Sequence, residues 1–262
     1  MTAIMTDLPE ALQGVVAKHP WLTAVHYFDA IDSTNALAME QVAKGAVANA
    51  ALYIANHQTA GKGRFENVWE SAPGDDVLFS LVIEPTVDAE AWPRMSFPLG
   101  LAIRDALAGF VPLHMAVQLK WPNDILANQQ KLVGMLLSSD VGANAIVAGI
   151  GVNVNHRSAV AERTSLAMLN HYPIQRWDVL DDVLTAIANH WSSICACEVP
   201  VNDWNQHAAH MNQTVEVTEQ HCIEGIFRGI NNAGAAMIET TNGVMPIING
   251  RNFRPLALPP SP

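Results

Sequence analysis

Residues 120–125 read Lys120-Trp121-Pro122-Asn123-Asp124-Ile125, and the chain around them has the pattern of a β-hairpin. Apolar and polar residues alternate over 115–120, which is the spacing of a strand. Pro122 has no N–H for a ladder hydrogen bond, so the strand should end there. A polar turn at 128–130 precedes a largely apolar run at 132–137, typical of a buried strand. The pattern predicts two arms, with Lys120 leaving one and Lys131 leaving the other.

Two lysines and an Asn-Asp pair near one strand end could bind a carboxylate, a phosphate and a metal ion together. Lys120 and Lys131 could equally be ordinary surface charges, and their spacing alone does not choose between the two interpretations.

The composition describes a globular chain with an acidic balance. Its 262 residues suit one large domain, or one large and one small, and 50% of them are hydrophobic. The formal charge of −11 argues against an unaided nucleic-acid binder and against anionic membrane surfaces. Three cysteines without metal-ligand spacing predict free thiols in a reducing cytosol. No signal peptide or membrane span is expected, so the predicted location is cytoplasmic.

Residues 1–20 are expected to form a short helical lead-in, followed by a strand at 25–28. Asp32-Ser33-Thr34-Asn35 then supplies several residues of the N-cap type, and a helix should run to Lys44 with Gly45 after its end. Ser33, Thr34 and Asn35 either cap this helix alone or also face a ligand.

An apolar strand at 50–56 leads into a loop in which glycines alternate with cations, Gly61-Lys62-Gly63-Arg64. Such a flexible loop can wrap an anion with its backbone N–H groups. It is not a Walker loop, because the spacing of that motif is absent.

The remainder of the first 210 residues predicts further core elements. Strands are expected at 77–83 and 145–155, and amphipathic helices at 96–110 and 180–194. Gly149 and Gly151 in the second strand allow close backbone approach. Asn153 and Asn155 at its end are either turn formers or readers of a purine edge.

From residue 211 the pattern changes to five short strands, at 214–218, 222–230, 235–240, 244–248 and 253–256, with hairpin turns between some of them. They predict a small SH3-like barrel. The expected domains are therefore 1–210 and 211–262.

Taken together, these motifs resemble the biotin protein ligase family. The resemblance rests on their order along nearly the whole chain: 33–35, 58–64, Trp69, 120–124, 131–134, 149–155, 164–166 and 225–230. The string Lys120-Trp121-Pro122-Asn123-Asp124 is the most specific of them. The implied fold is α+β, a mixed-sheet catalytic domain of the biotin/lipoate ligase type followed by the small barrel.

The resemblance implies an ATP-dependent enzyme with two half-reactions. Biotin would be activated to biotinyl-5′-AMP, and the biotinyl group would then pass to a lysine of the biotin carboxyl carrier protein of acetyl-CoA carboxylase. Both steps gather negative charge, so positioning and cations should supply most of the catalysis.

The resemblance also implies roles for individual residues. The biotin pocket would be formed by Ser33, Thr34, Asn35 and Gln58, with Gly134 permitting close approach. The loop closing over the adenylate would be Gly61, Lys62, Gly63 and Arg64. Adenine would be contacted by Trp69 and by Asn153 or Asn155. The catalytic cations would be Lys120, Arg64 and Lys131, and Mg²⁺ and triphosphate would be positioned by Asn123 and Asp124.

The chain departs from the family pattern in two places. Lys62 stands where arginine is common, and Phe65-Glu66-Asn67-Val68 replaces a basic continuation, which puts Glu66 beside the expected anion site. There is also no room before residue 25 for the DNA-binding module of bifunctional ligase–repressors, so a monofunctional enzyme that binds no DNA is expected.

Two alternatives stay open beside the ligase. A lipoate or octanoate transferase of related fold would want a reactive cysteine near a lysine, and none of Cys195, Cys197 and Cys222 is well placed for that. A non-catalytic biotin or adenylate sensor would account for the altered loop. Association into a homodimer through sheet edges is a further possibility.

Overall fold

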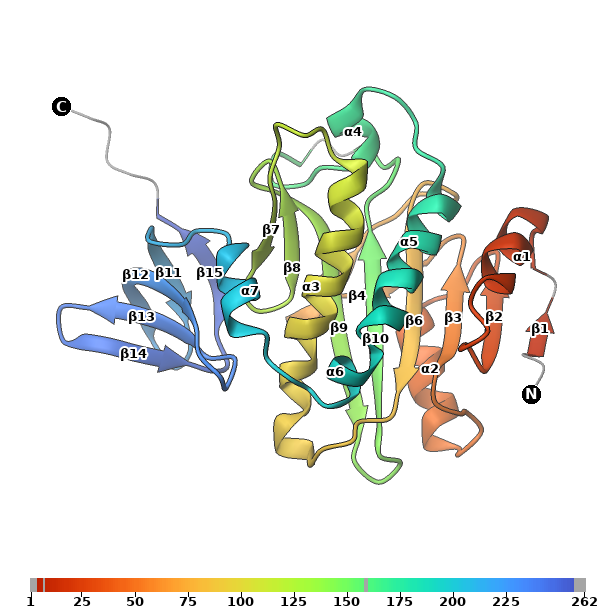
Figure 1. Cartoon of the computed structure of the whole chain (residues 1–262), viewed down its shortest axis with the longest axis horizontal. Helices are drawn as coiled ribbons and strands as arrows, with labels where there is room; N and C mark the ends of the chain where they lie inside the picture. The colour runs from red at the N-terminus through yellow and green to blue at the C-terminus, as the bar shows by residue number, and fades with distance from the viewer. Residues whose placement is uncertain (1–3, 7, 158–159, 257–262) are drawn as a thin grey trace.

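The computed structural model describes residues 4–6, 8–157 and 160–256, without the side chains of residues 4–6 and Glu66. Its centre is an eight-stranded mixed sheet with the order β1-β2-β3-β6-β10-β9-β8-β7 (Figure 1). The strands are β1 (Ile4–Thr6), β2 (Ala24–Phe28), β3 (Ala51–Ala55), β6 (Val77–Ile83), β7 (Val117–Lys120), β8 (Asp124–Ala127), β9 (Gln130–Asp140) and β10 (Ala145–Val152). Only β1, β2 and β3 pair in parallel; the remaining pairs of the sheet are antiparallel.

Helices cover both faces of this sheet. The helices are α1 (Glu10–Ala17), α2 (Thr34–Ala43), α3 (Ser96–Leu107), α4 (Leu166–Asn170), α5 (Arg176–Asn189), α6 (Trp191–Cys195) and α7 (Val201–Gln206), with 3₁₀ turns at Ala89–Met95 and Ala108–Phe110. The buried faces of α3 and α5 join the main core, whereas α2 packs through Ala38 and Val42 on a second cluster with Tyr53 and Val147 (Figure 1). Every residue of β3 and β6 is buried, as expected for strands covered on both sides.

Several predicted elements differ from the structure at their boundaries. The lead-in predicted at 1–20 contains β1 as well as a helix of eight residues, while residues 1–3 and 7 lie outside the described residues. The helix predicted at 180–194 is two helices, because His190 leaves helical geometry and its ring contacts the carbonyl of Ala186.

The prediction of a single hairpin around Lys120 and Lys131 was wrong. Asp124–Ala127 forms a strand of its own, β8, which pairs with β7 on one side and β9 on the other. Asn128 and Gln129 both have positive φ, as a two-residue hairpin turn between β8 and β9 requires. The two lysines therefore leave strands that are separated by a third.

Residues 214–255 form a second, antiparallel sheet at one end of the molecule (Figure 1). Its strands are β11 (Thr214–Thr218), β12 (Cys222–Ile230), β13 (Ala236–Thr240), β14 (Gly243–Ile247) and β15 (Arg251–Pro255), in the order β14-β13-β12-β11-β15. All five predicted strands are present, in agreement with the SH3-like unit expected. The domain boundary at 210/211 stays a prediction.

Trp121 joins the two sheets. It follows β7, is 1% exposed, and donates from Nε1 to the carbonyl of Gly234 at 3.0 Å. Its ring lies edge-on to Phe253, 5.6 Å between centroids, and close against Gly250. The corner between β7 and β8 is thereby held against the small sheet. Among the described residues no helix is both long enough and apolar enough to cross a bilayer.

We expect Trp121→Ala to lower the free energy of unfolding by about 3–5 kcal/mol, because it removes a buried ring and leaves a cavity between the two sheets. Tyr172, 59% exposed, offers a control: Tyr172→Ala should stay within about 0.5 kcal/mol of the parent protein. Urea unfolding of the three proteins measures the difference, and equal stabilities would contradict this account of the junction.

Candidate active site

A cavity of about 500 Å³ lies over β9 and β10, between the start of α2, the β7–β8 corner and the first residues of β15. Six of the chain's 14 lysines and arginines line it, although the chain carries a net charge of −11. They are Lys62, Arg64, Lys120, Lys131, Arg163 and Arg251. The carboxylates that line it are Glu70 and Asp124. This concentration of positive charge makes the cavity suited to an anionic ligand.

The glycine-rich segment is a small hairpin rather than the flexible loop expected from its composition. Strand β4 (Gly61–Lys62) pairs with β5 (Val68–Trp69), and a 3₁₀ turn at Arg64–Glu66 connects them. The N–H of Gly63 donates to the carbonyl of Asn67 at 2.7 Å, which closes the turn. We call residues 61–69 the flap.

The floor of the cavity is made of glycines because an indole ring lies on it. Gly134 of β9 and Gly151 of β10 are paired, and a β-carbon at either would lie 2.6 or 2.4 Å from the Trp69 ring. Lys131 also crowds Gly134. In this structure Gly134 therefore makes room for protein side chains, and its predicted role beside biotin stays a prediction.

Arg64 connects the flap to the corner between β7 and β8. Its guanidinium donates to Oδ1 of Asn123 at 3.2 Å, and the Asn123 amide donates in turn to the carbonyl of Met135. Burial lowers the pKa of Arg64, and the charge of Asp124 opposes that shift. The two predicted ligand-binding segments thus contact each other directly.

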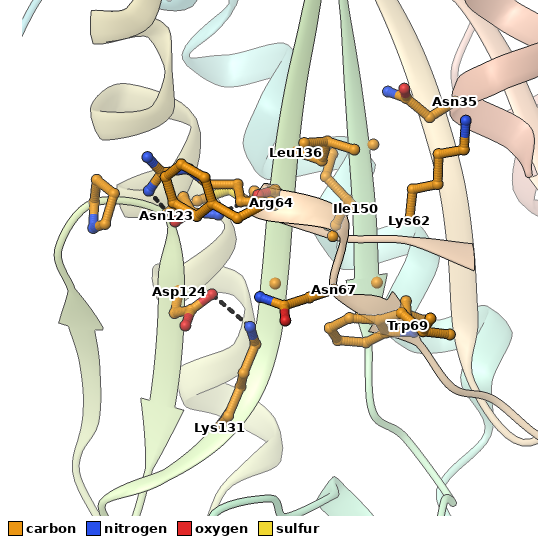
Figure 2. Close-up of a pocket in the computed structure, with 18 of the residues that line it drawn as sticks. Asn35, Lys62, Arg64, Asn67, Trp69, Asn123, Asp124, Lys131, Leu136 and Ile150 are labelled. Carbon is orange, nitrogen blue, oxygen red and sulfur yellow. Dashed lines mark hydrogen bonds and ion pairs between the residues drawn. The ribbon is translucent and has the colours of Figure 1, made fainter. Parts of the chain in front are cut away.

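Lys120 is a half-buried cation whose pairing differs from that of Lys131. Lys131 is paired with Asp124, 2.7 Å from Nζ to Oδ1, but the Lys120 amine has no hydrogen bond or ion pair among the residues that the structure describes. Burial lowers the pKa of Lys120; Asp124 opposes this shift and Lys131 adds to it. Figure 2 shows Asp124 and Lys131 facing each other at one end of the cavity, with Lys62 and Asn35 at the other. Although they leave non-adjacent strands, both lysines line the same cavity.

The residues at the start of α2 have separate tasks. Ser33 is the N-cap, accepting from the N–H of Ala36 at 3.3 Å, so the capping interpretation holds for its side chain. Thr34 donates to Oε1 of Gln58 from its backbone N–H at 2.8 Å and from its hydroxyl at 3.1 Å. The same hydroxyl lies 2.8 Å from the hydroxyl of Ser80, a residue that no sequence motif points to. All of them line the cavity.

Asn35, in the first turn of α2, packs its side chain on the cavity floor at Gly149. Its amide donates to the carbonyl of Val147 at 3.2 Å, and its Oδ1 accepts from Ser138 at 2.8 Å. A β-carbon at Gly149 would meet the Asn35 amide at 3.1 Å. Both polar ends of this side chain already have partners within the protein.

The two asparagines after β10 differ in position. Asn153 is 3% exposed, lines the cavity, and donates to the carbonyls of Thr164 at 3.0 Å and Lys131 at 3.3 Å. Asn155 is outside the lining, and its amide exchanges hydrogen bonds of 2.9 and 2.8 Å with the backbone of Ile174. Of the two, Asn153 is therefore better placed to reach a ligand.

The predicted metal ligands have cationic partners. Asp124 faces Lys131, and the Asn123 oxygen accepts from Arg64. Mg²⁺ commonly binds through one or two carboxylates together with substrate phosphates. One carboxylate beside an amide oxygen fits an ion that enters with a polyphosphate.

Other lining residues had no signal in the sequence. Arg163 comes beside Lys131 through an isolated β-bridge and pairs with Glu70 at 3.2 Å. Asn67 lies on the flap, and Arg251 comes from the small sheet. These are polar residues without a motif, so only the folded chain identifies them.

Asp76 holds the segment that carries Asn153. It is 1% exposed, and its Oδ1 accepts from the N–H of Val154 at 2.9 Å. Its other oxygen lies 3.8 Å from His156 Nδ1 and has no hydrogen bond among the described residues. Burial raises its pKa from the ordinary 3.8 to about 7.

This raised pKa has a measurable consequence for stability. The protonated carboxyl favours the folded state, so its contribution is complete below about pH 4 and is lost as the pH rises through about 7. Each pKa unit is worth about 1.4 kcal/mol, which makes the expected loss several kcal/mol. Asp76→Asn cannot ionise and should flatten this part of the curve. Urea unfolding of both proteins between pH 5 and 8 tests it; parallel curves would contradict the raised pKa.

Known proteins share this fold and the sequence of its central part. Residues 27–155 match the Biotin/lipoate A/B protein ligase family. The biotin–[acetyl-CoA-carboxylase] ligase of Paracoccus denitrificans is 30% identical over 228 residues, which cover 81% of this chain and 92% of that protein. The bifunctional ligase/repressor BirA of Bacillus spizizenii is 27% identical over 84% of this chain and 71% of its own length. The biotin protein ligase of Aquifex aeolicus, solved in complex with biotin and ATP, has a TM-score of 0.75 at 24% identity, covering 88% of this chain and 97% of that one.

A mixed sheet with a small antiparallel sheet at its end, and the motifs of 27–155, define the biotin/lipoate ligase class of fold. Within it, the chain belongs to the biotin protein ligase family. The predicted family, and with it the prediction of an enzyme, are confirmed.

Proposed function

We propose that the chain is an ATP-dependent biotin protein ligase, which forms biotinyl-5′-AMP and transfers the biotinyl group to a lysine of the biotin carboxyl carrier protein of acetyl-CoA carboxylase. The observation that carries the proposal is the Lys120 amine, unpaired among the described residues, in a cavity lined by five further cations. The names of the relatives support biotin and ATP as the substrates.

In the first step the biotin carboxylate attacks the α-phosphorus of ATP, and pyrophosphate leaves. Two anions must be brought into contact, and their repulsion is the main obstacle. Lys120 supplies a charge that has no ion-pair partner among the described residues, and Arg64 and Lys131 line the same cavity. Such cations stabilise the charge that accumulates on the oxygens around phosphorus. A lysine amine acts here as a movable point charge, without the fixed fork of arginine.

The two ends of the cavity suit the two substrates. The polar groups of Ser33, Thr34, Asn35 and Gln58 would surround the ureido ring of biotin. Trp69 and Asn153 would contact the adenine. Mg²⁺ bound with the triphosphate would neutralise phosphate charge, held by Asp124 and Asn123. These assignments follow the lining of the cavity and the family motifs.

In the second step the ε-amine of the carrier lysine attacks the carbonyl carbon of the mixed anhydride. An amide forms, AMP leaves, and the amine loses a proton. The flap with Lys62 and Arg64 would cover the adenylate and exclude water from the anhydride until the carrier arrives.

Two copies of the chain would associate as a homodimer through their sheet edges.

We expect Lys120→Ala to reduce biotin-dependent pyrophosphate release by about 10²- to 10³-fold, since it removes the cation shared by the carboxylate and the α-phosphate. Lys44→Ala is the control: that exposed lysine pairs with Glu40 on the surface of α2. It should retain full activity. Near-normal turnover by Lys120→Ala would remove the assignment of this residue.

We expect biotin, and not octanoate or lipoate, to drive pyrophosphate release. A transferase with a thioester intermediate would need an accessible thiolate at the site. Burial raises the pKa of Cys197 to about 11, and neither it, Cys195 nor Cys222 lines the cavity. Parallel assays with the three acids measure the preference, with labelling of a carrier domain as the second readout. Octanoyl transfer to a carrier domain without pyrophosphate release would favour the transferase, and tight biotin binding without labelling would favour a sensor.

A further inference from the structure

The small sheet contributes an arginine to the cavity. Arg251 is the first residue of β15 and lines the cavity together with its neighbours Gly250, Asn252 and Phe253. Its Cζ lies 4.8 Å from the centroid of the Phe65 ring, which belongs to the turn of the flap. A residue near the C-terminal end thus contacts the segment that covers the predicted adenylate site.

Arg251 differs from the other two arginines of the small sheet. Arg228 pairs with Glu239 at 2.6 Å, and Arg254 pairs with Glu216 at 2.9 Å. Within the part of the chain that the structure describes, Arg251 has no carboxylate partner. Its contact is the ring on the flap, a cation–π geometry.

The conformation of Phe65 indicates that something holds this ring in place. Its φ of 54° and ψ of 44° are left-handed, which is uncommon for a bulky side chain and points to a constraint from the surroundings. The ring is 50% exposed, so packing in a core does not supply that constraint. Two guanidinium groups lie close to it: Arg251 at 4.8 Å and Arg64 at 4.7 Å.

We infer that Arg251 is a positioning residue, through which the small sheet holds the flap over the cavity by way of the Phe65 ring. The flap is then anchored at two points, since Arg64 binds Asn123 at the β7–β8 corner and Phe65 meets Arg251 on the small sheet. That the flap covers an adenylate rests on the proposed function, whereas the contact between Arg251 and Phe65 does not.

A planar guanidinium suits this task better than an ammonium. It can lie against an aromatic face with its weakly hydrated surface while its edge stays available to an anion. Arg251→Lys would therefore keep the charge at the cavity and lose most of the stacking. The behaviour of Arg251→Lys therefore distinguishes a role of Arg251 in positioning the flap from a role that depends only on its charge.

Hydrogen exchange of the full-length protein without ligands tests the contact. We expect amide exchange in residues 61–69 to rise about two- to fivefold in Arg251→Ala, as loss of an exposed cation–π contact predicts. Phe65→Ala should give a similar rise, the double variant no more than either, and Arg251→Lys an intermediate rise. Arg254→Ala removes the same charge from the same strand away from the cavity and should leave the flap unchanged. Thermal unfolding of each variant shows that its fold is intact.

Activity supplies the second readout. In Arg251→Ala we expect the KM for ATP and the hydrolytic loss of the adenylate to rise more than kcat falls, with Arg254→Ala as the unchanged control. Unchanged exchange at 61–69 in Arg251→Ala, or fully additive effects in the double variant, would overturn the inference. If no protein in the series ligates biotin, the proposed function fails, while the exchange data still decide the role of Arg251.

Discussion

The site depends on a half-buried cation, Lys120, that has no ion-pair partner in the part of the chain that the structure describes. Lys120 is largely removed from water, and Asp124, the carboxylate whose charge opposes the resulting pKa shift, forms its ion pair with Lys131. Like charges at short range and partial desolvation both disfavour the charged amine. An anion that enters between these cations relieves both penalties at once. The cavity is therefore arranged so that ligand binding, and not a protein carboxylate, completes its electrostatics.

This arrangement requires that several segments meet with little space between them. Glycines at 134 and 151 let the Trp69 ring lie on β9 and β10, and Gly149 does the same for Asn35. Trp121 fixes the β7–β8 corner to the small sheet, so that Lys120 and the first residues of β15 line one cavity. The small sheet is in this way part of the wall of the site.

Sequence patterns are informative for some elements of this fold and uninformative for others. Alternation and apolar runs correctly located β3, β6 and β10, because buried strands of this length have few other solutions. The strand β8 was missed because four residues between two turns are too short to show a period. Asn153 and Asn155 have the same local pattern, yet one lines the cavity and the other caps a loop through Ile174. Which of two identical side chains faces a ligand depends on where the folded chain places each of them.

The amino-acid order alone was sufficient for the family, the mixed sheet with its small barrel, and many of the polar residues around the cavity. Motifs such as 120–124 and 61–64 can be recognised from the sequence because their residues are neighbours in the chain. Tertiary structure alone decided that, of the two lysines, Lys131 pairs with Asp124 while Lys120 has no ion pair within the described ranges, and that Arg163 and Arg251 join the site. Those facts are distances between segments far apart in sequence, and no local pattern encodes a distance of that kind.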